Sequence, residues 1–385
     1  MFMPKQATAT LEDLLDTCAE IKAGHRVLIL AATDGLHGGP NLVDEAVVGW
    51  IQNGVQQRQA QASVLWIDLS HRPHAWQGPP IVKGALENTD IFISHAFDLP
   101  YEELLELRDI LDEHRVPMIR NMATTAPLFA SAWAGTPYEL VSEIRFQTGS
   151  LFRAGLPWTI RSPLGTHLRG VIGPPLPPFK HYAELRSEGF YRPFPEGVFT
   201  PVRTRDTEGI LVFDRTLSWW ARYIGLPPRF SQPVRLEIRS NRLVSFEGGE
   251  EAKTLEHFYS TMAERFGETV YDISGIHGGV HPQAVVSPHE CPDPAYREFI
   301  EHHHTGSIHL HLGRVSRTAA YPYMWHITAE LRGITWQVGE ELVYDEGRLC
   351  TLNRPEVHAL AAQYHSRPGI PAGSLKNLPT ERKRI

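Results

Sequence analysis

The first third of the chain alternates between stretches of helical and of strand character, and this order constrains the fold more than any other feature. Residues 11–22 place apolar side chains at helical spacing, and residues 25–32 (HRVLILAA) have the length and composition of a buried strand. The same order recurs until about residue 125. Strands that alternate with helices usually pair in parallel and are covered on both faces. We therefore expect a parallel-sheet α/β domain over residues 1–149.

The pattern changes near residue 150. Short runs rich in β-branched and aromatic residues follow, separated by turn signals such as residues 239–242 (RSNR) and 344–347 (YDEG). One helix-like stretch, residues 250–267, interrupts them. We therefore expect an α+β domain over residues 150–385, with mostly antiparallel pairing, and we expect this domain to carry the metal site argued below.

Charge and cysteine content exclude several classes of protein. The 385 residues carry a formal net charge of −7, without the clustered Lys and Arg that nucleic acids or anionic membranes attract. No apolar run approaches the roughly 18–20 residues of a membrane helix. Cys18, Cys291 and Cys350 are too few and too scattered for a disulfide framework, which is typical of a reducing compartment. We expect a cytoplasmic protein without a nucleic-acid or membrane partner.

Histidines gather in one part of the chain. Nine of the twenty lie between residues 277 and 326, and imidazole is the commonest metal ligand in proteins. In residues 306–313 (GSIHLHLG), strand alternation puts His309 and His311 on one face. The run His302–His304 is typical of a polar loop.

Two further segments carry candidate ligands. His277 and His281 emerge from a glycine-rich stretch, in which glycine permits close approach of the backbone, although a solvated turn has the same pattern. In residues 325–331 (WHITAEL), alternation puts His326 and Glu330 on one face. Such a face suits metal ligation, but a half-buried strand with a solvated polar face looks the same.

Five segments resemble, in order, motifs of the M29 aminopeptidase superfamily. They are residues 160–173 (IRSPLGTHLRGVIG), 193–214 (PFPEGVFTPVRTRDTEGILVFD), 272–282 (DISGIHGGVHP), 306–313 (GSIHLHLG) and 325–335 (WHITAELRGIT). The last segment most resembles that of the 2,5-dihydroxypyridine 5,6-dioxygenases, which are non-haem Fe(II) ring-opening enzymes. The resemblance implies either one Fe(II) held by two histidines and a carboxylate, or, as in the peptidases, two divalent metals held by Glu, His and Asp.

Several ligand positions depart from these patterns. The family Asp two residues after the last histidine is Thr328 here, the Asp of the first motif is His167, and a ligand of the glycine-rich motif falls on Gly275. Glu196 is displaced by one residue from its family place. These lost carboxylates argue against a two-metal hydrolase.

Residues two positions away offer substitutes. On an extended strand, His277 projects from the same face as Gly275, and Glu330 from the same face as Thr328. The resemblance itself assigns His326 and His309 as ligands. We therefore expect a metal site formed by His277, His309, His326 and Glu330, an N/O donor set that suits a first-row metal.

Three functions are compatible with these residues. The favoured one is a mononuclear Fe(II) dioxygenase that cleaves a small hydroxylated aromatic or N-heteroaromatic ring with O2, with His309, Glu330 and His95 (or His37) in catalytic roles. Mn(II) or Zn(II) would fit a hydrolase of the aminopeptidase, amidase or aminohydrolase type, and a metal-free binding protein is the third. Four aromatic residues are candidate walls of the site, with core packing as the alternative: Tyr321, Tyr323, Trp325 and Trp336. The resemblance also suggests a homodimer or larger homo-oligomer.

Overall fold

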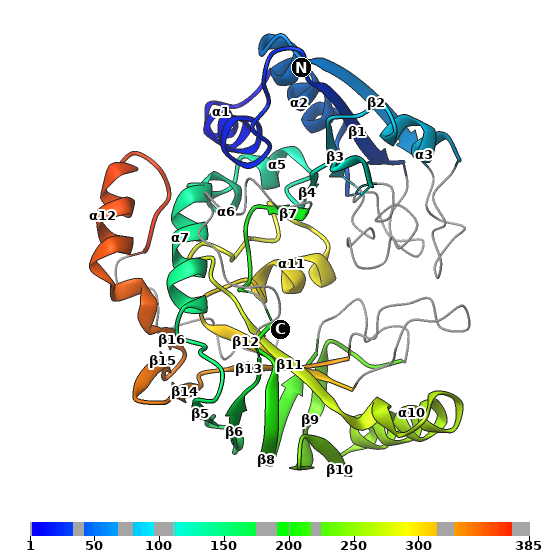
Figure 1. The fold of residues 1–385 in the computed structure, drawn as a ribbon, viewed down its shortest axis with the longest axis vertical. Coiled ribbons are helices and arrows are strands. Elements are labelled where there is room, and N and C mark those ends of the chain that lie inside the picture. The colour runs from blue at the N-terminus through cyan, green and yellow to red at the C-terminus, as the bar shows by residue number, and fades with distance from the viewer. Residues whose placement is uncertain are drawn as a thin grey trace.

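The computed structural model of the chain describes residues 2–33, 42–67, 80–95, 111, 113–174, 191–199, 201–216, 225–313 and 327–371. Three sheets organise these residues, as Figure 1 shows. A parallel sheet lies at the top of that view, an eight-stranded sheet at the bottom, and a three-stranded sheet between them. The predicted combination of a parallel-sheet α/β part with a mostly antiparallel part is confirmed.

The first sheet has five parallel strands in the order β2-β1-β3-β4-β7. They are β1 (Arg26–Ala32), β2 (Gln61–Ile67), β3 (Ile91–His95), β4 (Met118–Asn121) and β7 (Tyr191–Phe194). β7 follows the predicted boundary at residue 150 and yet pairs with β4. The boundary itself stays a prediction.

Helices cover this sheet on both faces. Alternate side chains of β1 point to opposite faces and pack against different helices. Val27 and Ile29 join a core with α2 (Glu45–Gln57), whereas Leu28 and Leu30 join another core with α3 (Pro80–Leu86). The remaining helices of this part are α1 (Lys5–Glu12), the π-helix η1 (Asp13–Cys18), α5 (Ala126–Phe129), α6 (Ala132–Gly135) and α7 (Tyr138–Gly149).

The second sheet has eight strands in the order β10-β9-β8-β6-β5-β14-β15-β16, all paired antiparallel. They are β5 (Pro157–Arg161), β6 (His167–Ile172), β8 (Thr204–Arg215), β9 (Arg229–Arg239), β10 (Arg242–Glu247), β14 (Thr335–Val338), β15 (Glu341–Asp345) and β16 (Arg348–Leu349). Both predicted hairpin turns are present: Ser240 and Asn241 have positive φ between β9 and β10, as do Glu346 and Gly347 between β15 and β16.

The second part of the chain holds more helices than the sequence indicated. The predicted helix is α10 (Glu250–Phe266), but α11 (Pro294–Glu301) and α12 (Pro355–Gln363) are also present, so the expectation of a single helix was wrong. Two short 3-10 turns, η4 (Glu268–Tyr271) and η5 (Cys350–Asn353), complete this part. α11 begins where the Asp293 side chain accepts a hydrogen bond from the Tyr296 N–H, with proline at the first helical position.

The third sheet is antiparallel and positions the site. It consists of β11 (Ile273–Gly278), β12 (Ser307–Leu312) and β13 (Thr328–Arg332). One face sends Ile276, Leu310 and Ala329 into the hydrophobic core of the second part. The other face is therefore left to the polar residues of all three strands.

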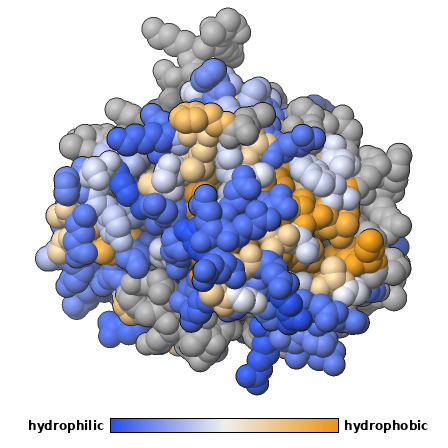
Figure 2. Space-filling model, turned by 90° about the horizontal axis from the view of Figure 1, so that it is seen from above, coloured by the Kyte–Doolittle hydropathy of each residue, from blue (hydrophilic) through white to orange (hydrophobic). Residues whose placement is uncertain are grey.

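The described surface is mainly hydrophilic on the face seen from above, with smaller groups of hydrophobic residues between (Figure 2). Within the described ranges, no helix combines the length and apolarity needed to cross a membrane.

Candidate metal centre

Polar side chains form three rows across the third sheet. His277, His309 and Glu330 are directly opposite one another in one row. The next row on one side holds Gly275, His311 and Thr328, and the next row on the other side pairs Ser307 with Arg332. The alternation predicted for His309 and His311 is confirmed, and the cross-strand pairing brings a third imidazole from β11 beside them.

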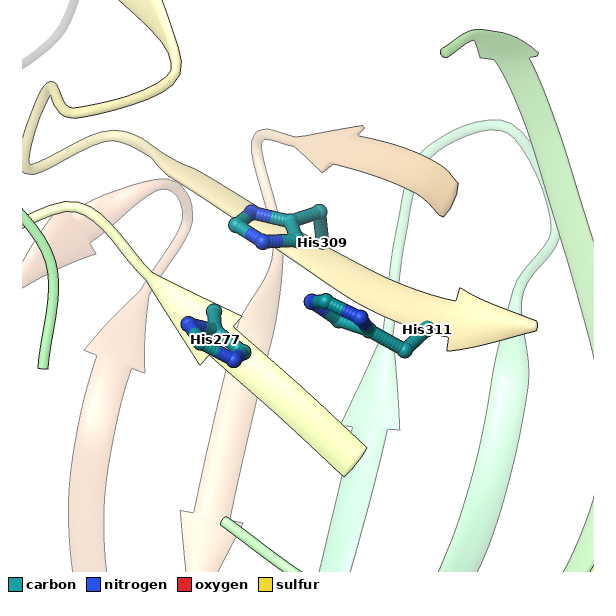
Figure 3. A group of neighbouring side chains, drawn as sticks. All are labelled: His277, His309 and His311. Carbon is teal, nitrogen blue, oxygen red and sulfur yellow. The ribbon is translucent and has the colours of Figure 1, made fainter. Parts of the chain in front are cut away.

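Three of these side chains form the histidine triad, which we define as His277, His309 and His311. Each offers one ring nitrogen, and these nitrogens lie within 4.8 Å of one another. Figure 3 shows the three rings gathered on one side of β11 and β12. The ring centroid of His277 lies 5.0 Å from that of His309 and 4.6 Å from that of His311. This is the arrangement in which one cation can take several nitrogen ligands.

Burial keeps His277 and His311 of the triad in the form that binds metals. Burial, with a smaller contribution from the nearby His302, lowers the pKa of His311 to about 4. Burial likewise holds the pKa of His277 well below its ordinary value. Metal ligation requires the neutral imidazole, and neutral imidazoles suit Fe, Zn, Cu and Ni. The residues present therefore fit a first-row divalent metal.

Glu330 lies beside the triad but belongs to an ionic cluster. Its Oε1 accepts hydrogen bonds from Arg332 Nε at 2.7 Å and from Ser307 Oγ at 3.1 Å. Burial raises the pKa of this carboxyl, but the charges of Arg332 and Arg215 outweigh burial and keep the pKa below its ordinary value. The structure thus places Glu330 in register with His309, as an ionised carboxylate already held by an arginine, and outside the group of three donors.

The other predicted site residues are more scattered. His326, with His37, Tyr321, Tyr323 and Trp325, lies outside the described residues. His95 ends β3 in the first sheet, where its Nδ1 is 3.1 Å from Asn121 Nδ2, and it is not a member of the triad. Burial lowers the pKa of His95 to about 3. Its Nε2 has no hydrogen-bond partner among the described residues. His95 lies at the carboxyl end of β3, and ligands commonly bind at the carboxyl ends of parallel strands.

Trp336, His167 and Glu196 do not contribute to the triad. Trp336 is fully buried, and its ring packs 5.0 Å from that of Phe152, which agrees with the core-packing alternative. His167 is exposed on β6. Burial raises the pKa of Glu196, whose carboxylate is 3.9 Å from Arg145.

The run His302–His304, called here the histidine loop, contradicts its interpretation as a polar loop. All three side chains are buried, with 4%, 5% and 6% exposure. The physical reason lies in glycines distant in sequence. A Cβ at Gly197 would lie 2.2 Å from His303 Cδ2, and a Cβ at Gly279 would lie 2.1 Å from the His304 carbonyl oxygen. The loop is therefore packed into a cradle that only glycine leaves open.

His302 connects this loop to the triad. Its Nδ1 bonds the Phe299 carbonyl oxygen, and because a carbonyl can only accept, the proton is on Nδ1 and the lone pair on Nε2. The ring centroid lies 5.3 Å from that of His309. Sequence reasoning missed this residue and gave His311 little weight. The signal available for both was the density of histidine on and just before one strand.

The glycine cradle gives a direct prediction. We expect Gly279→Ala to lower the free energy of unfolding by roughly 3 kcal/mol, because the added Cβ meets backbone atoms that cannot rotate away. Metal affinity should fall with it, since the loop packs on the triad. Gly49→Ala in α2 is the matched control: nothing lies within 4 Å of its Cβ, so this variant should be neutral or slightly stabilised. Equilibrium denaturation compares the free energies of unfolding of the two variants. Equal values would show that the histidine loop does not require glycine at position 279.

Comparison with known proteins places the fold. No protein-family model matches the chain, and no curated protein matches it. Among solved structures, the chain is similar to 2,5-dihydroxypyridine dioxygenase from Pseudomonas putida KT2440, with a TM-score of 0.63 and 16% sequence identity. The similarity covers 92% of this chain and 99% of that chain. At this identity the comparison establishes a shared fold, whereas membership of the M29 superfamily stays a prediction.

Proposed function

We propose that the protein is a metal-dependent dioxygenase that cleaves a small hydroxylated aromatic or N-heteroaromatic ring. The observation that carries the proposal is the histidine triad, whose three ring nitrogens lie within 4.8 Å of one another on one face of the third sheet. The fold shared with a ring-cleaving dioxygenase supports it. Fe(II) is the metal that this reaction favours, and the ligand roles of His326 and Glu330 stay predictions from the sequence.

Each described group has a proposed role. The triad would hold the metal, which when bound supplies open coordination positions and the redox chemistry that ring cleavage by O2 requires. Glu330, fixed by Arg332 and Ser307, gives the buried site a compensating negative charge. His302, whose Nδ1 bonds the Phe299 carbonyl oxygen, is the proposed acceptor of a proton from a substrate hydroxyl. His95 remains the proposed acid or base on the side of the first sheet.

A divalent-metal hydrolase is the second candidate, and the same donor set favours it. Three imidazoles also hold Zn(II) in enzymes that activate water. The two functions differ in their need for oxygen, because metal-assisted hydrolysis proceeds anaerobically.

Oxygen uptake tests the proposal. We expect protein reconstituted anaerobically with Fe(II) to consume about one O2 per ring cleaved when a panel of hydroxypyridines and dihydroxybenzenes is supplied. Zn(II)-loaded protein is the control, and it should consume none. Protein that binds iron but shows no uptake with any ring, or that hydrolyses amides without oxygen, would remove the dioxygenase function.

A further inference from the structure

A buried arginine lies on the same sheet face as the triad. Arg332 ends β13, two residues after Glu330 and opposite Ser307 on β12. Residues two apart on a strand point to the same side and lie about 7 Å apart. Arg332 therefore stands one row from His309, opposite the small side chain of Ser307.

Two of the three guanidinium nitrogens of Arg332 donate hydrogen bonds to carboxylates of the protein. Arg332 Nε donates to Glu330 Oε1 at 2.7 Å, and Nη2 donates to Glu301 Oε2 at 3.4 Å. Nη1 has no hydrogen-bond partner among the described residues, although the side chain is only 7% exposed. A buried charged donor without a partner is costly, so this atom is suited to receive an acceptor from a ligand.

Two arginines contribute positive charge near the triad. Burial is the largest cause of the lowered pKa of His302, Glu330 raises this pKa, and the positive charges of Arg120 and Arg332 lower it. Besides burial, Arg332 also lowers the pKa of His304. The two N–H groups of Nη1 are the part of the arginine fork that remains for a planar carboxylate, whereas a phosphate dianion would be repelled more strongly by the neighbouring Glu330 and Glu301.

We propose that Arg332 anchors a carboxylate on the substrate ring, so that the substrate is a hydroxylated aromatic or heteroaromatic acid. This inference rests on the proposed function, because it assumes that a ring binds at the triad. Glu330 and Glu301 then act together, because they hold the guanidinium in place through Nε and Nη2 and leave Nη1 for the ligand.

The test compares two ligands that differ only in charge. Calorimetry on Zn(II)-loaded protein, in which no oxidation occurs, measures binding of 3,4-dihydroxybenzoate and of the neutral 3,4-dihydroxybenzamide. In both, the hydroxyls are adjacent and the third substituent is too distant to chelate the same ion. We expect the wild-type protein to prefer the acid at least tenfold.

Two variants separate anchoring from a structural role. Arg332→Lys retains the charge beside Glu330 but loses the fork, so it should reduce the preference at least threefold with the amide affinity unchanged. Arg332→Gln combined with Glu301→Gln removes one charge of each sign and should abolish the preference. Equal binding of acid and amide by the wild-type protein, or a preference that both variants retain, would overturn the anchor alone. Failure of both ligands to bind the metal-loaded protein would overturn the ring-binding function as well.

Discussion

Replacing His309 with alanine should abolish stoichiometric metal binding. His309 stands between His277 and Glu330 in register and beside His311 on its own strand, so its loss leaves two imidazoles that no longer surround a common point. Mutation of a residue that only hydrogen-bonds a metal ligand already lowers metal affinity by roughly 10–100-fold. Loss of a ligand itself should therefore lower the affinity for Fe(II) or Zn(II) by more than about 100-fold. Elemental analysis and competition with a chromophoric chelator measure the effect.

His257→Ala is the matched control for that variant. His257 is exposed on α10 and takes no part in the triad, so its loss should leave the metal content unchanged. Circular dichroism of both variants verifies that the fold persists. If the His309→Ala protein retained one metal per chain, the triad would not be the metal centre, and His326→Ala would show whether the remaining predicted ligand is.

The central strands of the parallel sheet, β1, β3 and β4, were predictable from the sequence because they are buried on both faces. β1 reads as an uninterrupted apolar run for that reason. β7 carries no such signal: its four residues include an arginine and a proline, and pairing with β4 joins residues about 70 positions apart. Local pattern cannot reveal a pairing that only tertiary contacts select.

The site was predictable in part. Alternation correctly put His309 with His311 and Glu330 with Thr328, because period two is a property of any strand. It could not show that His277 would face His309, since this register includes an irregularity between Ile273 and Gly275. The histidine loop was misread because its burial depends on glycines at positions 197 and 279, far away in sequence.

The buried histidines should make the metal-free protein unusually sensitive to mild acid. Burial lowers the pKa of seven imidazoles, those of His95, His277, His281, His302, His303, His304 and His311. In the unfolded chain each titrates near 6.5. Between that pH and about 4, the unfolded state binds more protons than the folded state, so stability is full above pH 6.5 and is lost as the pH falls.

The expected slope is steep. Each imidazole contributes about 1.4 kcal/mol per pH unit inside its window, and seven together approach about 10 kcal/mol per pH unit. Since domains are stable by only about 5–15 kcal/mol, cooperative unfolding should occur within about two pH units below 6.5. Carboxylates such as Asp90 cannot cause this early loss. Hydrogen bonds from Arg26 hold the pKa of Asp90 at about 2, and the stability that this lowered pKa contributes is lost only below about pH 4, where a carboxyl of the unfolded chain binds its proton.

Equilibrium denaturation at a series of pH values measures this slope, and one substitution assigns it. His304→Gln can keep the hydrogen bond from the Gly306 N–H while removing the titrating ring, so it should flatten the slope by about one proton. His257→Gln on the exposed face of α10 should leave it unchanged. Stability that stayed constant from pH 7 to pH 5 would show that the imidazoles accept protons inside the folded protein. Where stability falls as expected, protonation of His277 and His311 opposes both folding and metal binding at the triad, so the same buried rings limit both at acid pH.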